Sequence, residues 1–220
     1  MWPIGIIMPE QSWYDTFSHF YDAATIGDFF YKRARKVAIE KLNLVNGATV
    51  LDVFCGTGVD FPLFAEIVRD DGIILGVDGS DGMLNKARHR ANKLSVDTSV
   101  VFLQSDLALP LGIKKAVEAI SAKQPTHVFF SLGLTCLANW RKVCEQIFDT
   151  CMPGTRFVIL DVYARHLTLG ARFINWIGSA DCRRPVWTLL EERCHSCTFE
   201  EFRPFKIFDV SVIVASGTKH

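Results

Sequence analysis

Short hydrophobic runs alternate with segments of helical periodicity along most of the chain. Runs rich in β-branched and aromatic residues predict buried parallel strands. The expected strands span residues 49–54, 73–78, 100–104, 126–132 and 155–162. Between them, apolar residues recur every three or four positions. The expected helices span residues 58–69, 81–93, 112–122 and 138–151. This order predicts parallel βαβ units and an α/β fold.

The last part of the chain changes to strict alternation. Between Lys206 and Ser216, apolar residues occupy every second position, which is the period of a strand with one buried face. We expect a late antiparallel strand here, in a hairpin with roughly residues 196–203. At 220 residues, the whole chain, 1–220, fits one α/β domain.

The N-terminal segment is aromatic and acidic. Residues 1–31 contain nine aromatic and four acidic residues but no Lys or Arg. A membrane-surface helix usually carries basic residues, so we expect residues 1–45 to form a helical lid over an apolar pocket. For any single aromatic, the alternative is a helix that only covers the sheet. Tyr14 and Tyr21, seven residues apart on one face, are the exceptions that we expect near an acceptor.

Composition narrows the function classes. Lys+Arg and Asp+Glu number 24 each, so no overall charge favours binding to nucleic acid. The seven cysteines are scattered, which suits a reducing compartment and a cytoplasmic location. No apolar stretch approaches the length of a transmembrane helix, and we expect no membrane span. Cys194 and Cys197 lack further ligands at metal-binding spacing, so we expect no metal site.

The most informative stretch is residues 50–60, Val-Leu-Asp-Val-Phe-Cys-Gly-Thr-Gly-Val-Asp. A buried strand containing Asp52 leads into a turn with Gly56 and Gly58, where a helix follows. Such a turn is the usual ligand crevice of an open α/β sheet. Twenty residues after Gly58, the next strand ends at Asp78, a position from which a carboxylate accepts hydrogen bonds from ribose hydroxyls. The pattern therefore predicts a ligand built on adenosine.

The turn does not suit a dinucleotide. The third glycine of a dinucleotide turn is replaced by Phe61, followed by Pro62 in the first helical turn. No G-x-x-x-x-G-K-[ST] phosphate loop occurs in the chain. We therefore expect an adenosine whose tail is not a chain of phosphates.

These residues resemble the first motif, VLD-x-x-CGTG, of the class I S-adenosylmethionine-dependent methyltransferases. Residues 76–84 resemble the second motif, and residues 101–107 resemble the third strand with its acidic end. The resemblance implies a Rossmann-like, seven-stranded, mostly parallel sheet in the order 3-2-1-4-5-7-6, with helices on both faces and an antiparallel last strand. It also implies S-adenosyl-L-methionine as cofactor. The implied cofactor-binding residues are Asp52, Cys55, Gly56, Thr57, Gly58, Asp78, Gly79, Met83, Asp106, Leu107 and Ser131.

The resemblance implies particular roles within this set. Asp52 binds the amino group of the methionine moiety, Asp78 the ribose and Met83 the adenine. Asp106 accepts from the adenine amino group, and Leu107 supplies a backbone N–H. Simpler alternatives exist: a strand-end acid for Asp52, a plain turn for the glycines and a helix cap for Asp106. Cys55 is expected to be a small apolar spacer rather than a reactive thiol.

The entry region, from Tyr21 through Arg33 and Arg35, resembles the quinone, betaine-lipid and phospholipid methyltransferases and related small-molecule N-methyltransferases. In that subgroup an aromatic residue of the lid lies over the methyl donor, which suggests Tyr21 for both donor and acceptor contact. Arg33 or Arg35 would reach the carboxylate of the donor. Either arginine is equally well explained as a solvated charge on a helix.

Residues 163–195 follow the fifth strand and are expected to form an insertion on the substrate side. Strand ends face the crevice of an open sheet, so Tyr163 and Arg165 are candidate acceptor contacts and His166 is the candidate base. A loop histidine is more often simply exposed to solvent.

The predicted reaction is in-line methyl transfer to a small, apolar or amine-bearing acceptor such as a metabolite, quinone or lipid. An amine needs only to be neutral, whereas a phenol or carbon acid requires a base. The alternatives are a protein or RNA methyltransferase, or a partner subunit that binds S-adenosylmethionine without catalysis. The acceptor and the oligomeric state do not follow from the sequence.

Overall fold

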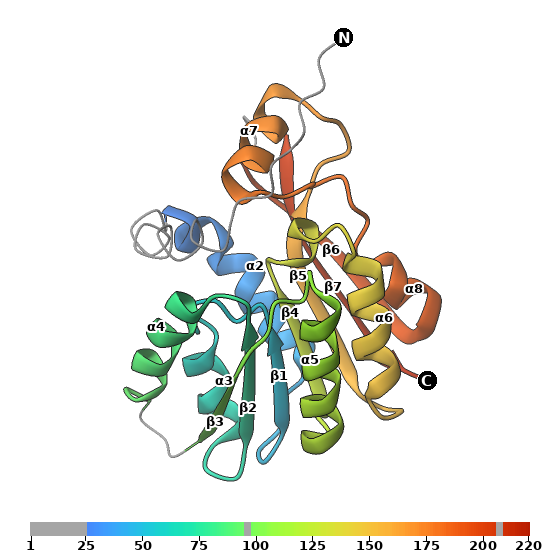
Figure 1. The fold of residues 1–220 in the computed structure, drawn as a ribbon. Helices are drawn as coiled ribbons and strands as arrows, with labels where there is room; N and C mark the ends of the chain where they lie inside the picture. The colour runs from blue at the N-terminus through green and yellow to red at the C-terminus, as the bar shows by residue number, and fades with distance from the viewer. Residues whose placement is uncertain (1–25, 95–97, 206–208) are drawn as a thin grey trace.

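The structure is a computed structural model that describes residues 26–94, 98–205 and 209–220. Its strands are β1 (Thr49–Val53), β2 (Ile73–Asp78), β3 (Ser99–Gln104), β4 (His127–Ser131), β5 (Arg156–Tyr163), β6 (Cys194–Phe205) and β7 (Val210–Lys219). They form one sheet in the order β3-β2-β1-β4-β5-β7-β6, as Figure 1 shows. The predicted order is thus confirmed.

The first five strands pair in parallel, and β7 pairs antiparallel with both β5 and β6. The last strand is therefore antiparallel, as predicted. The carboxyl ends of β1, β2, β3, β4 and β5 consequently meet at one edge of the sheet, where an open α/β sheet binds its ligands.

The helices of the described residues are α2 (Ile26–Leu42), α3 (Phe61–Val68), α4 (Asp81–Ala91), α5 (Pro110–Lys123), α6 (Trp140–Thr150), α7 (Leu169–Gly178) and α8 (Thr188–Arg193), with a 3-10 turn η1 (Leu134–Cys136). Local signals fix several helix starts. Ser80 caps α4 by accepting a hydrogen bond from the Met83 N–H at 3.2 Å, and α5 begins at a proline.

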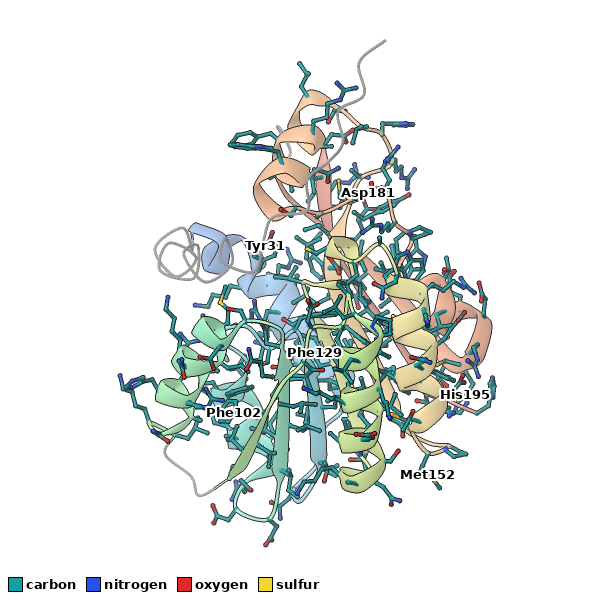
Figure 2. The ribbon with its side chains drawn as sticks, in the orientation of Figure 1. Tyr31, Phe102, Phe129, Met152, Asp181 and His195 are labelled. Atoms are coloured by element: carbon teal, nitrogen blue, oxygen red, sulfur yellow. The ribbon has the colours of Figure 1, made fainter. Side chains whose placement is uncertain are left out.

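Two apolar layers cover the sheet, because side chains alternate along each strand. On β5, Phe157 and Ile159 pack toward α5, α6 and α8. Val158 and Leu160 pack toward α2, α3 and α4. Figure 2 shows side chains filling both layers, with the fully buried Phe129 near the middle of the sheet. Helices therefore lie on both faces, as predicted.

A third, smaller apolar cluster joins β5 to the connection that follows it. Val162 and Ala164 pack there with Ala171 of α7 and with Cys182, and the Ala164 N–H donates to the Cys182 carbonyl at 2.8 Å. In Figure 1, α7 extends beyond the carboxyl ends of the strands. Among the described residues, no helix has the length and apolar character to cross a bilayer.

Candidate cofactor site

The turn after β1 has an unusual backbone. Phe54, Gly56 and Gly58 all have positive φ, at 64°, 52° and 72°. A Cβ on Gly58 would lie 2.7 Å from ring atoms of Phe61 and 3.2 Å from Cβ of Ala87. Only glycine fits that position, since both its backbone angle and its neighbours exclude a side chain. At Gly56 and Gly58 the turn therefore presents backbone atoms without side chains at the edge of the sheet.

Asp78 at the tip of β2 is joined to this turn. Its carboxylate accepts from the Gly56 N–H at 3.0 Å through Oδ2 and from the Ser80 N–H at 2.9 Å through Oδ1. Burial raises the pKa of Asp78, and these backbone hydrogen bonds act in the opposite direction. Each carboxylate oxygen keeps a further lone pair. Asp78 can therefore hold the turn and still accept from two neighbouring hydroxyls.

Asp52 in β1 is fully buried. Neither of its carboxylate oxygens has a hydrogen-bond partner among the described residues. Burial is the main cause of its strongly raised pKa; the nearby Asp60 raises it further, and Arg35 acts against the shift. A buried carboxylate without a partner is costly unless a ligand provides one. This position suits a cationic donor such as an ammonium group.

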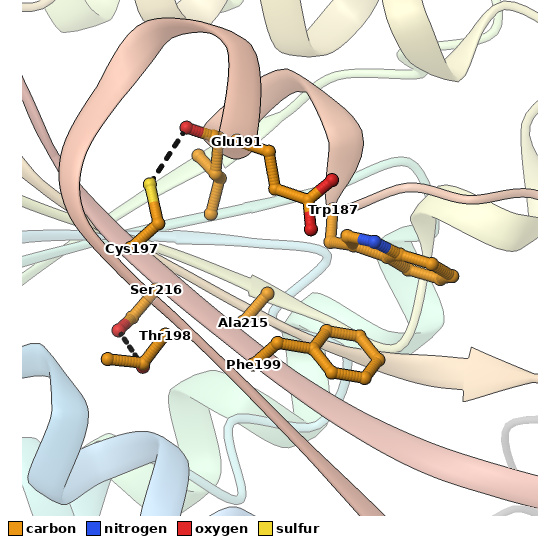
Figure 3. A pocket seen from close by; sticks show the side chains of 8 residues that line it. Trp187, Glu191, Cys197, Thr198, Phe199, Ala215 and Ser216 are labelled. Atoms are coloured by element: carbon orange, nitrogen blue, oxygen red, sulfur yellow. Dashed lines mark hydrogen bonds between the residues drawn. The ribbon is translucent and has the colours of Figure 1, made fainter.

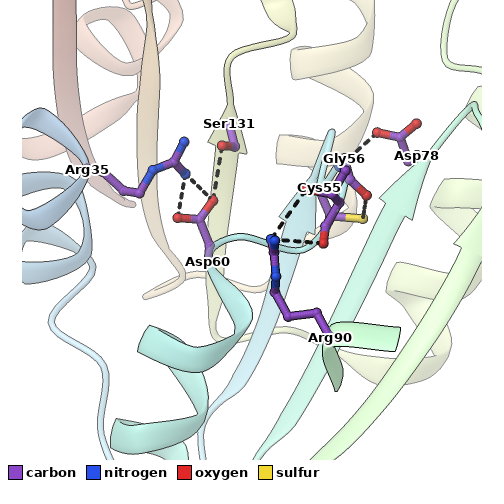
Figure 4. A network of polar contacts seen from close by, with 8 residues as sticks. Arg35, Cys55, Gly56, Asp60, Asp78, Arg90 and Ser131 are labelled. Atoms are coloured by element: carbon purple, nitrogen blue, oxygen red, sulfur yellow. Dashed lines mark hydrogen bonds and ion pairs between the residues drawn. The ribbon is translucent and has the colours of Figure 1, made fainter. Parts of the chain in front are cut away.

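A buried ion pair joins α2 to the turn. Arg35 Nη1 donates to both carboxylate oxygens of Asp60, at 2.6 and 2.5 Å, and the Ser131 hydroxyl donates to Asp60 Oδ2 at 3.2 Å. Figure 4 shows these contacts bridging α2, the turn and the end of β4. Ser131 thus lies in the site region, but its hydroxyl is used by Asp60.

The other side of the turn is fixed from α4. Arg90 Nη1 donates to the carbonyl of Thr57 at 3.1 Å and lies 3.3 Å from its hydroxyl (Figure 4). No motif or spacing along the chain singles out Arg90 or Asp60. Asp60 lies just before α3 and resembles an ordinary helix cap, and both pairings join residues more than twenty positions apart.

The ends of β2 and β3 lie close together. A Cβ on Gly79 would be 3.4 Å from the Asp106 Cα. Met83 is nearly buried in the first turn of α4 and Leu107 is buried beside the end of β3. Asp106 Oδ1 accepts from the Ala108 N–H at 2.9 Å. This contact closes a local turn before α5; the N-cap of that helix is Leu109, so Asp106 is not the helix cap that the sequence allowed as an alternative to ligand binding.

The cysteines show no sign of reactivity. Cys55 is buried, and burial strongly raises the pKa of its thiol. Its Sγ lies 3.9 Å from the Gly56 carbonyl. Cys197 Sγ lies 3.0 Å from the Leu190 carbonyl. No cluster of three metal-ligating side chains occurs in the part of the chain that the structure describes.

The residues predicted on the acceptor side do not gather in one place. Tyr163 stacks edge-on against Trp187, with ring centroids 4.7 Å apart, on the face covered by α6 and α8. Arg165 and His166 are exposed in the connection before α7. Arg33, which was expected to reach the carboxylate of the donor, is exposed, with its guanidinium 5.8 Å from the ring centroid of Phe202 on β6, so the structure does not bring it to the turn. Tyr14 and Tyr21 lie outside the described residues.

One shallow pocket, of about 70 Å³, lies away from this edge, between α8 and the β6–β7 hairpin (Figure 3). Ser216 in its wall is paired with Val158 in the middle of β5. This pocket is therefore not part of the crevice at the strand ends.

The acceptor groups at the strand ends fit S-adenosylmethionine. Asp52 offers a buried acceptor for its ammonium group, Asp78 offers acceptors for ribose hydroxyls, and Gly58 leaves room for close approach to the turn. S-adenosylmethionine has no phosphate group, so it requires no phosphate-binding loop at this turn. Fold and site together define an α/β protein of the methyltransferase class.

The comparisons agree with this class. A family model described as a methyltransferase domain matches residues 44–193. Demethylmenaquinone methyltransferase of Oceanobacillus iheyensis is 25% identical over 131 residues, covering 60% of this chain and 51% of that relative. 2-phytyl-1,4-naphtoquinone methyltransferase of Thermosynechococcus vestitus is 28% identical over 143 residues, covering 64% and 58%. The chain thus spans about half to three fifths of the length of these two relatives.

A solved structure is similar over more of the chain. Phosphoethanolamine N-methyltransferase 2 of Haemonchus contortus, in complex with S-adenosyl-L-methionine, superposes with a TM-score of 0.66 at 14% identity. The match covers 93% of this chain and 57% of that one. The chain belongs to the methyltransferase-domain family, in the class I group that uses S-adenosylmethionine.

Proposed function

We propose that this chain transfers a methyl group from S-adenosylmethionine to a small, apolar or amine-bearing acceptor. The observation that carries the proposal is Asp52, a fully buried carboxylate with no hydrogen-bond partner in the described residues, next to the glycine turn. A carboxylate kept there at the expense of stability is best explained by a cationic ligand.

The residues of the crevice have separate roles in this proposal. Asp52 accepts from the ammonium group, and Asp78 accepts from the ribose hydroxyls. Met83 packs against the adenine, and Asp106 accepts from its amino group. The bound donor supplies a methyl group on a positively charged sulfur. The chain contributes orientation of the two reactants and exclusion of water.

The acceptor class is supported by composition and by the relatives. A net charge of zero provides no field for nucleic acid, and the relatives reported above are named for quinone and phosphoethanolamine acceptors. An amine acceptor would need only to be neutral when it attacks, and the exposed His166 is the candidate base for an acceptor that must lose a proton.

The direct test incubates the protein with methyl-labelled S-adenosylmethionine and a cell extract. The products are then separated into organic, aqueous and macromolecular fractions. We expect label in the organic or small-molecule aqueous fraction, and none with the Asp78→Ala variant. Label only in precipitated protein or RNA would support a macromolecule methyltransferase instead. Donor binding without labelled product would support a non-catalytic subunit.

A further inference from the structure

The pocket between α8 and the β6–β7 hairpin lies outside the crevice at the strand ends (Figure 3). Its volume of about 70 Å³ is room for about five water-sized groups. Trp187 and Phe199 line it together, with ring centroids 4.9 Å apart and ring planes tilted by 52°. The pocket therefore fits the head group of a small molecule and is too small for a nucleotide.

The hydroxyl and thiol groups of the pocket wall already have partners within the chain. The hydroxyls of Thr198 and Ser216 lie 2.8 Å apart. The Cys197 thiol donates to the Leu190 carbonyl at 3.0 Å. Figure 3 shows both contacts as dashed lines. Because these groups are used by the fold, they leave little for a ligand that depends on several hydrogen bonds.

Glu191 is the one charged residue in the lining of the pocket. Its side chain points from α8 toward Trp187 in Figure 3. Burial raises the pKa of the Cys197 thiol and Glu191 raises it further, which agrees with a carboxylate close to the pocket wall. This carboxylate forms no ion pair or side-chain hydrogen bond with the described residues.

The other charges of α8 are paired outside the pocket. Glu192 forms an ion pair with Arg141. Arg193 Nη2 lies 2.7 Å from Asp149 Oδ1. Glu191 is thus the acid of this helix that has no cationic partner among the described residues, and it stands beside two aromatic rings. A carboxylate next to aromatic rings favours an organic cation, since both attract positive charge.

We propose that this pocket binds the methylated ammonium group of a small molecule. The ammonium group lies against the rings of Trp187 and Phe199, and its charge faces the Glu191 carboxylate. A methylated ammonium suits the pocket better than a primary amine, because it is held by aromatic rings and charge and needs no set of hydrogen-bond acceptors. The site is separate from the crevice at the strand ends and does not depend on the proposed methyl transfer.

The test is ligand-detected NMR with choline and the full-length protein. Saturation transfer from the protein to the choline methyl groups is measured in a titration. We expect a dissociation constant on the order of 1 mM, which is usual for so small a ligand. The neutral analogue 3,3-dimethylbutanol has the same shape without the charge. It should bind at least about fivefold more weakly, since the rings and the carboxylate attract only the cation.

Matched variants locate the binding. Glu191→Gln should weaken choline binding by about fivefold. Glu192→Gln removes the neighbouring acid, which pairs with Arg141 outside the pocket, and should leave binding unchanged. Phe199→Leu should weaken binding by about two- to fivefold, whereas Phe199→Tyr, which keeps an aromatic ring, should preserve it. Thermal melting confirms that each variant is folded.

Four results would overturn the proposal. The absence of a choline signal, or equal binding of choline and 3,3-dimethylbutanol, would show that the pocket does not select a cation. Equal effects of Glu191→Gln and Glu192→Gln would reduce the effect to general surface charge. Binding that is lost in Asp52→Asn but unchanged in Glu191→Gln would place choline in the crevice at the strand ends. Methyl transfer is measured separately, so failure of either proposal is recognisable.

Discussion

Asp52, which is fully buried, and Asp78, which is partly buried, are both acids at the strand ends, yet their surroundings differ. Asp78 accepts from two backbone N–H groups, whereas Asp52 has no partner among the described residues. Burial raises the pKa of both. Asp78 therefore has partners within the fold, whereas Asp52 is the group that we propose a ligand satisfies.

Because of this difference, we expect Asp52→Asn to increase the stability of the protein and to weaken ligand binding. Without ligand, the variant should be more stable at neutral pH by about 1 kcal/mol or more, because an amide is cheaper to bury than a carboxylate. Affinity for S-adenosylhomocysteine should fall at least about tenfold, since a charged hydrogen bond contributes about 1.5–3 kcal/mol. Urea unfolding and calorimetry measure the two effects.

The pH dependence has a definite sign. The pKa of Asp52 is raised in the folded state, so its destabilising effect is complete above that raised pKa, shrinks as the pH falls below it and is gone near the ordinary value of 3.8. The stability gain of Asp52→Asn should therefore shrink on acidification. Asp81→Asn, at an exposed acid, should change stability by less than about 0.5 kcal/mol. A destabilised Asp52→Asn protein with unchanged affinity would refute the ligand role.

Residues of the site were predictable where the signal is local. Asp52, Gly56, Gly58 and Asp78 were found from spacing along the chain, and the structure brings them to one edge of the sheet. Arg35 and Arg33 were not distinguishable, because two positions on a helix differ by about 200° and the buried side was unknown. The structure places Arg35 in the ion pair.

At the scale of elements, α2 is held to the turn by the Arg35–Asp60 pair. Removing one partner of a buried pair leaves the other charge uncompensated. Arg35→Met should therefore lower the free energy of unfolding by about 3–5 kcal/mol.

The matched control lies one residue further along α2. Lys36 pairs with Glu40 at 3.9 Å with both side chains well exposed, so Lys36→Met should change stability by less than about 1 kcal/mol. Arg35→Met combined with Asp60→Met should recover part of the loss. Equal effects of Arg35→Met and Lys36→Met in chemical unfolding would show that the pair does not hold α2.

The regular elements were predicted to within a few residues, because their apolar periods are simple. Helix α7 was not predicted, because residues 163–195 were expected only as an insertion on the substrate side, without assigned elements. Helix α8 and η1 are too short for a periodic signal. The tie between η1 and β5 is also nonlocal: buried Asp161 accepts from the Thr135 hydroxyl at 2.7 Å.

At the scale of the whole molecule, the sheet order brings five parallel strand ends to one edge. After β3, at one edge of the sheet, the chain crosses back to β4 on the other side of β1, so the strand order reverses beside β1. The glycine turn follows β1 and therefore lies at this switch point. This arrangement explains why acids from separate strands meet at the turn. The family resemblance predicted this sheet order. It did not predict the acceptor, because contacts to the acceptor depend on the segments after β5 and before α2, which follow no common pattern.

Calorimetry with S-adenosylhomocysteine shows whether this turn binds an S-adenosyl ligand. We compare the unmodified protein with Asp78→Ala, Asp78→Asn and, as control, Asp81→Ala. Thermal melting confirms that each variant is folded, since Asp78 also accepts from Gly56 and Ser80. We expect binding by the unmodified protein and by Asp81→Ala.

We also expect Asp78→Ala to weaken binding by about a hundredfold or more, because two charged hydrogen bonds of about 1.5–3 kcal/mol each are lost. The affinity of Asp78→Asn, which keeps the shape but not the charge of Asp78, should lie between that of the unmodified protein and that of Asp78→Ala. No binding by the unmodified protein, or unchanged affinity in a folded Asp78→Ala variant, would show that the turn is not an S-adenosyl site.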